Sequence, residues 1–285
     1  MILILLPAYN EAPCIGTLLS KIKTVMETNA LNYQVIVVND GSHDGTASVV
    51  QEYAGRMPIE MIYHRLNRGL WETVRDGFEW VAEHSQPDDI LIRMDADDTH
   101  EPKHIPAMVE KIAEGYDVVI ASRFEPGGGS EGLGAYRSFI SRCANLVMKL
   151  FFPIKGVREY SCGYRGYRVE IVQNAIRVFG NSFIDLKGVG FTCTLEKLIK
   201  LRMMGARFAE VPFVLRYDQK ISQSKMLSSI TTLGYFVLIL KYLYPWGETG
   251  KRWQKTIQQL HGNRNGQQVA LASNRDKLSK YYTQD

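Results

Sequence analysis

The sequence predicts an α/β protein with a doubly wound, mainly parallel sheet that carries helices on both faces. Short apolar runs alternate with helix-like segments through the first half of the chain, which is the pattern of doubly wound folds. The runs are continuous and do not alternate with polar residues, as expected for strands covered on both faces. Polar clusters follow three of these runs, at the sheet edge where such folds bind ligands.

The runs place individual strands and helices along the chain. The expected strands are 2–6, 34–38, 59–63, 90–94 and 118–121. The helices expected between them are 12–28, 46–55, 70–83 and 103–114. The second half is less regular: a glycine-rich loop at 126–134 is followed by helices near 136–152 and 192–204 and a strand near 208–215.

Length and composition fit one large domain with appendages. The chain has 285 residues, 45% of them hydrophobic, and a formal net charge of +4. The basic excess lies in the segment after Trp246, and it is too small to predict a nucleic-acid partner. We expect a main domain over 1–228, an amphipathic interfacial helix over 229–246 and a polar, basic tail over 247–285.

Cysteine usage and the apolar segment near the C-terminus bear on location. The 4 cysteines form no Cys-x-x-Cys pair, and the N-terminus has no basic leader, which together predict a cytoplasmic protein with reduced thiols. Residues 230–246 contain an uncharged stretch too short to cross a bilayer, beside Tyr and Trp residues that favour the membrane interface. Two interpretations stay open: a helix peripheral to the membrane, or a buried or homodimer-forming helix.

The strongest single feature is the acidic run Asp95-Ala96-Asp97-Asp98, directly after the expected strand 90–94. Several carboxylates at one strand end repel one another, which favours a bound cation. Hard oxygen ligands suit Mg²⁺ or Mn²⁺, which also bind substrate phosphates. The alternative is an acidic helix start, because Pro102 is a residue that begins helices and helix N-termini favour anions.

Two more polar clusters follow the first and second expected strands. Residues 39–46 read NDGSHDGT, a composition that a turn and a capped helix also explain; in the functional interpretation, Asp40 accepts hydrogen bonds from a nucleobase. Residues 7–11 read PAYNE. There Asn10 caps a helix, or Tyr9 flanks a base and Glu11 accepts a hydrogen bond from the base or ribose.

The three clusters, in this order and spacing, resemble the inverting glycosyltransferase family that includes dolichol-phosphate mannosyltransferase and bacterial polyprenyl-phosphate glycosyltransferases. The similarity covers about residues 1–230. Later stretches are similar to further family motifs: Ser122-Arg123 with the glycine loop to SR…GGG, Tyr160–Arg165 to D-x-T-S-G-F-R, Gly190-Phe191…Glu196 to G-F…E, and the segment from Val211-Pro212 to P…R…SK.

The resemblance implies a GT-A fold, a nucleotide-sugar donor over the first half of the chain, and Mg²⁺ or Mn²⁺ held by Asp95 and Asp97. Carried over by position, the nucleotide-binding residues are Pro7, Tyr9, Glu11, Asp40, Asp95 and Ala96. The residues for phosphates and acceptor are Arg123, Arg137 and Ser224, and the catalytic residues are Asp97, Arg216 and Lys225. Metal, Arg and Lys charges stabilise the negative charge that develops on a diphosphate leaving group. The alternative for the arginines is solvated surface charge.

The resemblance also implies a phosphate acceptor. A phosphate monoester with a second pKa near ~6 is largely a dianion at neutral pH, so it needs no general base, whereas a hydroxyl acceptor would. Asp185 and Glu196 are weak candidates for such a base. We therefore expect a metal-dependent, inverting enzyme that moves a hexose from GDP-mannose or a UDP-hexose to polyprenyl or dolichyl phosphate at a membrane surface. The alternatives are transfer to a glycan or protein hydroxyl, a sugar nucleotidyltransferase, and a catalytically weak nucleotide-sugar-binding module.

The chain departs from the family pattern at several positions. Thr99 stands where a Gln often joins the metal, so Asp98 or water would complete the site. Asn39 replaces the first Asp of the family's DDGS, Leu70 the lysine of N-x-G-K-G, and Glu159 the Asp before x-T-S-G. These changes affect the choice of sugar and base more than the class of reaction.

Two motif matches carry little weight. His100-Glu-Pro-Lys-His104 fits the zinc pattern H-E-x-x-H, which needs both histidines on one face of a continuous helix. Pro102 belongs at a helix start, so His100 falls outside that helix. Gly127-x-Gly129-x-x-Gly132 fits a dinucleotide fingerprint but lies far from the first strand–helix turn. We expect a loop that closes over the substrate there.

Overall fold

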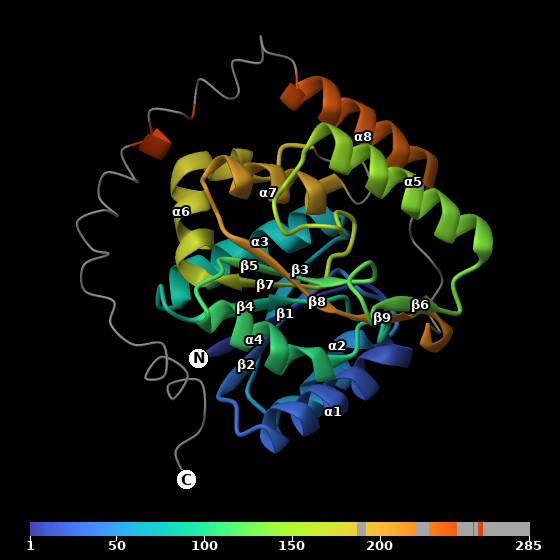
Figure 1. The fold of residues 1–285 in the computed structure, drawn as a ribbon. Coiled ribbons are helices and arrows are strands. Elements are labelled where there is room, and N and C mark those ends of the chain that lie inside the picture. Colours follow the sequence, from blue (N-terminus) through green and yellow to red (C-terminus); the bar gives the residue numbers. More distant parts are fainter. Residues whose placement is uncertain (187–191, 221–227, 244–252, 254–255, 259–285) are drawn as a thin grey trace.

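The computed structural model describes residues 1–186, 192–220, 228–243, 253 and 256–258. These residues form a central sheet covered by helices on both faces (Figure 1). The strands of the sheet are β1 (Ile2–Ala8), β2 (Tyr33–Asp40), β3 (Ile59–His64), β4 (Ile90–Arg93), β5 (Val118–Ser122), β7 (Arg165–Arg168) and β8 (Phe208–Pro212). Their spatial order is β3-β2-β1-β4-β7-β5-β8, and β6 (Gly129–Glu131) pairs with β9 (Val214–Arg216) in a separate small sheet.

Helices form layers on the two faces of the sheet. One face carries α1 (Ala12–Thr28), α2 (Thr46–Ala54) and α4 (Ile105–Ala113), which follows the short 3₁₀ helix η1 (Pro102–His104). The other face carries α3 (Leu70–His84), α6 (Val169–Phe179), η2 (Gly180–Phe183) and α7 (Thr192–Met203). Two helices, α5 (Ala135–Phe151) and α8 (Ser228–Leu243), run side by side outside this second layer (Figure 1).

The apolar runs form strands because both faces of the sheet are buried. Every residue of β1 is buried, and so is every residue of β4. Strands β1, β2, β3 and β4 pair in parallel, as do β5 and β8. The prediction of a mainly parallel, doubly wound sheet is confirmed, and the strands expected in the first half lie within two residues of the observed bounds.

The sequence did not predict strand β7 of the central sheet or helix α6, which packs on the sheet. Strand β7 lies antiparallel between β4 and β5. Its sequence RGYR has no apolar run, yet Arg165 is buried because its guanidinium donates to the backbone oxygens of Thr194 (2.7 Å) and Tyr160 (2.8 Å). A buried charge that is satisfied by main-chain carbonyls leaves no mark in a hydropathy pattern.

Helix α8 is fastened to α7 by a buried carboxylate. Glu196 is fully buried and accepts hydrogen bonds from Tyr242 Oη (2.7 Å), Lys241 Nζ (3.3 Å) and Lys200 Nζ (3.1 Å). It also accepts from the backbone N–H groups of Asp185 and Leu186. Among the described residues, none of the helices combines the length and the apolar character needed to cross a membrane.

Lys197 of α7 is a second buried charge, and we expect it to make stability depend on pH. Its Nζ lies 4.2 Å from the ring centroid of Phe78. Burial, with the nearby charges of Arg93 and Arg165, lowers the pKa of Lys197 to about 7. The unfolded chain therefore binds more protons between that pKa and the ordinary value of 10.5. In this window stability rises with pH, and below it the cost of the buried charge is present in full.

We expect Lys197→Met to be more stable than the parent at pH 6, because it removes a buried charge. The advantage should shrink as the pH rises towards 10. Urea-unfolding midpoints of both proteins at pH 6, 8 and 9.5 measure this difference. A difference that stays constant with pH would contradict the lowered pKa.

Candidate active site

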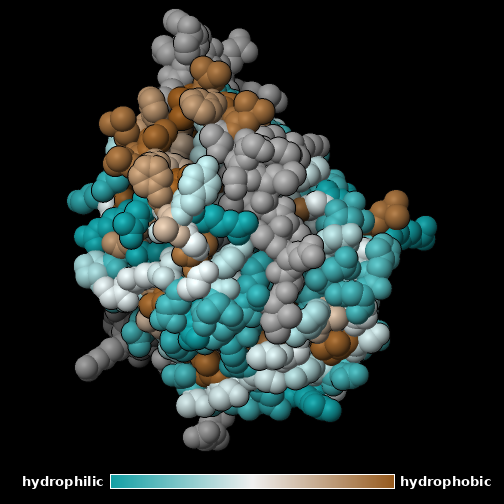
Figure 2. Space-filling view, turned by 90° about the vertical axis from the view of Figure 1, so that its right-hand side faces the viewer, coloured by the Kyte–Doolittle hydropathy of each residue, from teal (hydrophilic) through white to brown (hydrophobic). Residues whose placement is uncertain are grey.

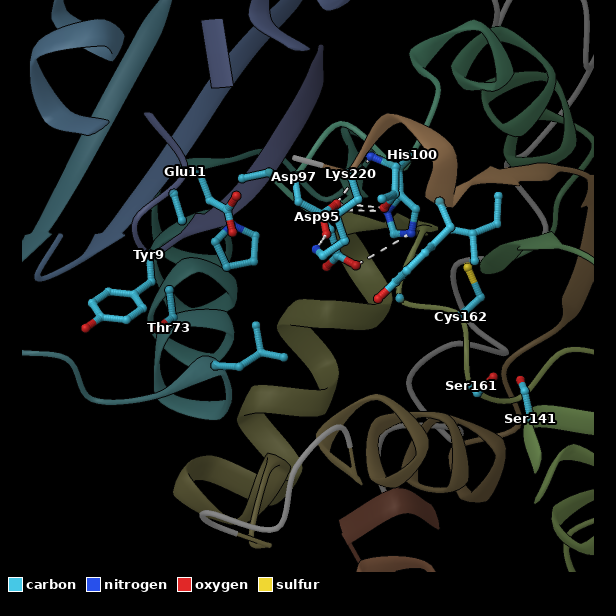
Figure 3. A pocket seen from close by; sticks show the side chains of 18 of the residues that line it. Tyr9, Glu11, Thr73, Asp95, Asp97, His100, Ser141, Ser161, Cys162 and Lys220 are labelled. Carbon is cyan, nitrogen blue, oxygen red and sulfur yellow. Dashed lines mark hydrogen bonds and ion pairs between the residues drawn. The ribbon is translucent and has the colours of Figure 1, made fainter. Parts of the chain in front are cut away.

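A cavity with a volume of about 970 Å³ lies at the carboxyl ends of the parallel strands. Strands β1, β2 and β4 each place polar residues in it at or just after their carboxyl ends, the ligand-binding edge of parallel sheets. Nine of the residues predicted for the site line this cavity: Pro7, Tyr9, Glu11, Asp40, Asp95, Ala96, Asp97, Arg123 and Arg137. In Figure 3, Tyr9 and Glu11 lie on one side of the acidic run, and Ser141 and Ser161 lie on the other.

Asp97 is held by a hydroxyl and an ammonium group. Thr99 Oγ1 donates to Asp97 Oδ1 at 2.6 Å, and Lys220 Nζ donates to Asp97 Oδ2. Burial raises the pKa of Asp97, but the positive charge of Lys220 outweighs it, so the net direction of the pKa is down. Asp97 is therefore a carboxylate at neutral pH.

Asp95 is positioned by two buried side chains, Arg93 and His100. Arg93 Nη2 lies 2.6 Å from Asp95 Oδ1, and the backbone N–H of Asp95 donates to His100 Nδ1 at 2.9 Å. Burial lowers the pKa of His100, and a ring nitrogen that accepts an N–H is unprotonated, so His100 is neutral. It stacks on Tyr164 at a centroid distance of 5.1 Å and serves as a rigid support for the acidic run.

Each carboxylate of the acidic run has a cation from this chain. Asp98 does not line the cavity; it accepts from Lys21 Nζ at 2.9 Å and 3.0 Å. Together with Arg93 at Asp95 and Lys220 at Asp97, this pairing compensates the three negative charges. Repulsion among these carboxylates is therefore not by itself evidence for a bound metal ion, because the described residues supply counter-charges.

The acidic run still has the ligand chemistry of a Mg²⁺ or Mn²⁺ site. Asp95 and Asp97 both line the cavity and present hard oxygen atoms. Among the described residues no three His, Cys, Asp or Glu side chains group together as metal ligands. Mg²⁺ typically uses one or two carboxylates and completes its shell with substrate phosphates and water. The two carboxylates fit this mode of binding, with Lys220 as a competitor at Asp97.

Asp40 lines the cavity but is engaged by the chain itself. Its carboxylate accepts from the backbone N–H groups of Arg68 (2.8 Å) and Gly69 (2.9 Å), and it lies 2.7 Å from His64 Nδ1. These contacts hold the loop that carries Asn67 to Gly69 against the rim of the cavity. A carboxylate has about four lone-pair sites, so one remains for a ligand. The prediction that Asp40 contacts a nucleobase stays a prediction.

Arg123 is fixed by a buried ion pair. Its Nε and Nη2 donate to the two carboxylate oxygens of Glu159 at 2.7 Å and 3.0 Å. Nη2 also donates to Ser141 Oγ (3.2 Å) and Ser161 Oγ (2.8 Å). Burial raises the pKa of Glu159, but the charge of Arg123 and the hydrogen bonds from Ser161 lower it by more. The net pKa lies below its ordinary value, so Glu159 is ionised at neutral pH. The result is a preorganised group of one cation and two hydroxyls on the cavity wall.

The other predicted cationic residues have different surroundings. Arg137 lines the cavity and donates to Tyr217 Oη at 2.7 Å. Arg216 is not among the residues that line the cavity; it pairs with Asp218 (2.8 Å) and Glu131 (3.2 Å). Ser224 and Lys225 lie outside the described residues.

The structure also places the remaining candidates. Asp185 and Glu196, the weak candidates for a general base, do not line the cavity, and Glu196 is enclosed by cations. His100 precedes η1 and α4 begins only after His104, so the two histidines do not share one α-helix face. The segment from Gly127 to Gly132 contains strand β6, which pairs with β9, in place of an irregular loop.

Lys220, Ser141 and Ser161 are among the polar residues of the cavity that the sequence did not predict. Ser141 lies on the inner face of α5, one helical turn after Arg137, and this spacing could have indicated a shared face. Lys220 and Ser161 have no such signal, because each reaches the cavity through a turn whose path depends on the tertiary fold.

The chain is similar in sequence to known glycosyltransferases. The family model described as "Glycosyl transferase family 2" matches residues 3–175. Dolichol-phosphate mannosyltransferase from Pyrococcus furiosus is 32% identical over 211 residues, which is 74% of this chain and 55% of that protein, so the chain spans about half the length of this relative. Undecaprenyl-phosphate mannosyltransferase from Micrococcus luteus is 29% identical over 80% of this chain and 88% of its own length.

Solved structures agree in fold. A crystal structure of glucosyl-3-phosphoglycerate synthase from Mycobacterium tuberculosis, in complex with Mn²⁺, UDP and glucosyl-3-phosphoglycerate, superposes with a TM-score of 0.56. It is 17% identical and the match covers 85% of this chain and 80% of that one. The GT-A fold and the family resemblance are both confirmed. Because the family model spans more than half of the residues, the chain belongs to glycosyl transferase family 2.

Proposed function

We propose that this chain transfers a hexose, mannose in the first instance, from a nucleotide sugar to a polyprenyl phosphate at a membrane surface, with inversion at the anomeric carbon. The relatives from Pyrococcus furiosus and Micrococcus luteus are mannosyltransferases whose names specify dolichol phosphate and undecaprenyl phosphate. The donor nucleotide is GDP or UDP; the structural neighbour described above was crystallised with UDP and Mn²⁺.

The observation that carries this proposal is the two-ended character of the cavity. Its polar end holds Glu11, Asp40, Asp95 and Asp97 after the strands. Its other end is lined by Leu133, which precedes α5, by Tyr136, Ile140 and Ala144 of α5, and by Tyr235 of α8. A sugar nucleotide fits the first end and an isoprenoid chain the second, because ligand sites match the polarity of what they bury. A glycan acceptor would not need the apolar end.

Arg123, Ser141 and Ser161 lie between the two ends, and this group would receive the acceptor phosphate. Glu159 accepts from Arg123 Nε, Arg123 Nη2 and Ser161 Oγ. The Arg123 Nη1 group and the Ser141 hydroxyl are therefore the donors offered to a phosphate dianion, beside the positive charge of the guanidinium. An oxygen of that phosphate would attack the anomeric carbon as the bond to the nucleoside diphosphate breaks on the opposite face. The attacking group carries no proton, so no general base is required. This agrees with the position of Asp185 and Glu196 away from the cavity.

The leaving diphosphate would face the acidic run. A divalent cation on Asp95 and Asp97 would supply charge neutralisation to the departing diphosphate. Arg137, and by the family resemblance Arg216, Ser224 and Lys225, would contribute further contacts to phosphates. Pro7, Tyr9, Glu11 and Ala96 would form the walls around the nucleoside, with Asp40 holding the loop at their rim.

The outer faces of α5 and α8 are the membrane contact in this proposal. Figure 2 shows apolar side chains gathered on this face of the molecule. Leu150 is 74% exposed and Leu240 is 66% exposed. The other exposed apolar residues of the two helices are Tyr136, Phe139, Leu146, Val147, Phe151, Leu233, Phe236 and Val237. Monomeric proteins rarely leave an apolar surface of this extent in water.

Charge favours a bilayer over a second copy of the chain as the occupant of this face. Helix α5 carries the exposed Arg142 and Lys149 and contains no acidic residue, and α8 contains no acidic residue either. Anionic lipid surfaces attract such residues, whereas two copies of one positive face repel each other. In this division the main domain is 1–228, α8 is the interfacial helix of 229–246, and the tail 247–285 lies almost wholly outside the described residues.

We expect the double change Leu146→Ser with Leu150→Ser to weaken binding to vesicles of phosphatidylcholine and phosphatidylglycerol by at least about ten-fold, since each leucine contributes about 1.5–3 kcal/mol when buried. Co-sedimentation measures this. Tyr63→Ser is the matched control, because Tyr63 is 54% exposed on β3 at the far edge of the sheet. Unchanged vesicle binding, with a change from dimer to monomer in analytical ultracentrifugation, would identify the face as a subunit interface instead.

The reaction is tested by incubating the protein with Mn²⁺, undecaprenyl phosphate, and GDP-mannose or UDP-glucose labelled in the sugar. The expected label passes into the organic phase on extraction with chloroform and methanol, and mild acid releases it as free sugar. Label that stays in the aqueous phase on a glycan would favour a hydroxyl acceptor. Binding of the donor without any transfer would favour a nucleotide-sugar-binding module.

A further inference from the structure

Lys220 occupies the position from which a cation would meet Asp97. It follows the short 3₁₀ helix η3 (Tyr217–Gln219), lines the cavity, and places its Nζ against Asp97 Oδ2 (Figure 3). Only 12% of its side chain is exposed. Figure 3 shows this contact beside Asp95, in the part of the cavity where the two carboxylates of the proposed metal site converge.

The backbone that carries Lys220 is fixed independently of its ammonium group. The backbone N–H of Arg216 donates to the Thr99 carbonyl oxygen at 3.1 Å. Gln219 Oε1 accepts from Lys21 Nζ at 2.9 Å, and the same ammonium group holds Asp98 and Glu101. Two contacts, one to Thr99 and one to Lys21, therefore hold the segment 216–219 beside the acidic run before Lys220 adds a third.

A fixed backbone with a flexible side chain allows exchange at Asp97. Lysine carries a compact charge on a four-carbon stem, so the ammonium can leave Asp97 while η3 stays in place. An ammonium and a divalent cation cannot share one small carboxylate site, because their charges repel. By mass action, each then lowers the apparent affinity of the other.

We propose that Lys220 is an exchangeable internal counter-ion of Asp97, which neutralises that carboxylate when no divalent cation is bound and must be displaced for one to bind. This inference rests on the metal site of the proposed function. Arg93 and Lys21 do not play the same part: Arg93 is buried beneath Asp95, and Lys21 pairs with carboxylates outside the cavity. The contact with Asp97 therefore weakens binding of the free ion.

The test is the affinity of the full-length protein for Mn²⁺ alone, measured by isothermal titration calorimetry without any nucleotide or lipid. We expect Lys220→Met to bind Mn²⁺ at least about ten-fold more tightly than the parent, since the competitor is gone. Lys220→Arg keeps a cation and should resemble the parent. Lys111→Met is the surface control, because among the described residues Lys111 forms its ion pair with Glu114, on the exposed side of α4.

Two further variants keep the result interpretable. Asp97→Asn in the Lys220→Met background should abolish the gain, which assigns the gain to Asp97. Lys220→Gln removes the charge but can still donate a hydrogen bond to Asp97, so it should also bind Mn²⁺ more tightly than the parent. It replaces the methionine variant if that variant does not fold. An Mn²⁺ affinity that is unchanged or weaker in both Lys220 variants would overturn the inference. Since no substrate is present, tighter Mn²⁺ binding in a protein that transfers no sugar would refute the proposed function and leave this inference standing.

Discussion

Asparagine in place of Asp97 is expected to lower kcat/KM for sugar transfer by about 10²–10³-fold, the usual loss when one electrostatic contact to a developing charge is removed. Asn keeps the shape of Asp and still accepts from Thr99, but it carries no charge. Lys220 then loses its counter-ion, and a divalent cation loses one of its two carboxylate ligands. The loss of the metal ligand acts on the charge of the leaving diphosphate.

The measurement is the initial rate of labelled lipid formation at limiting donor concentration, with Mn²⁺ held constant. Glu114→Gln is the control for the same chemical change, because Glu114 is exposed at the end of α4 and pairs only with Lys111 among the described residues. Far-ultraviolet circular dichroism should show the same spectrum for all three proteins. Activity of Asp97→Asn above about a tenth of the parent would contradict a central role for this carboxylate.

The largest loss of stability is expected from Glu159→Gln. Glu159 is fully buried and forms two hydrogen bonds with Arg123, and it also accepts from Ser161 Oγ at 2.8 Å and from two backbone N–H groups. The amide leaves the Arg123 charge without its partner in a buried position, which costs about 3–5 kcal/mol. Arg123 would also lose its orientation towards Ser141 and Ser161, so transfer should fall together with the free energy of unfolding.

The chain contains its own control for this change. Arg158 and Glu125 form an ion pair of 2.6 Å in which the side chains are 49% and 31% exposed. Glu125→Gln should cost no more than about 1 kcal/mol, as exposed pairs do. Urea unfolding at pH 7 separates the two variants. Equal losses in both would show that burial does not determine the strength of the Glu159 pair.

The Glu159–Arg123 ion pair also predicts that stability depends on pH. The pKa of Glu159 in the folded protein lies below its ordinary value of 4.5. Its contribution to stability is therefore present above that ordinary value and is lost as the pH falls through the folded pKa. The difference in unfolding free energy between the parent and Glu159→Gln should accordingly be constant near neutral pH and shrink below pH 4.5.

Much of the fold was accessible to sequence reasoning because its signals are local. Continuous apolar runs predicted β1 to β5, and the polar clusters behind them predicted which residues gather at the sheet edge. Strand β7 and helix α6 were missed for a physical reason: β7 is stabilised by a buried Arg165 that donates to carbonyl oxygens, and this is a tertiary contact. No pattern of hydropathy along the chain reports such a partner.

The candidate site shows the same difference between local sequence signals and tertiary contacts. Asp95 and Asp97 were predicted because they follow a buried strand, and both line the cavity. What the sequence could not show is how their charges are compensated, since Lys21, Arg93 and Lys220 come from three distant parts of the chain. Arg216 was predicted from a motif, but in the structure its guanidinium group pairs with Asp218 and Glu131.

The attachment of α8 has a consequence for protein engineering. Tyr235 of this helix lines the cavity, and Lys241 and Tyr242 tie the helix to Glu196 inside the catalytic body. A shortened chain that ends before Ser228 would thus lose part of the cavity wall and leave a buried carboxylate with fewer partners. Removing this apolar helix to improve solubility would therefore also remove part of the wall at the end of the cavity that is proposed to bind the acceptor.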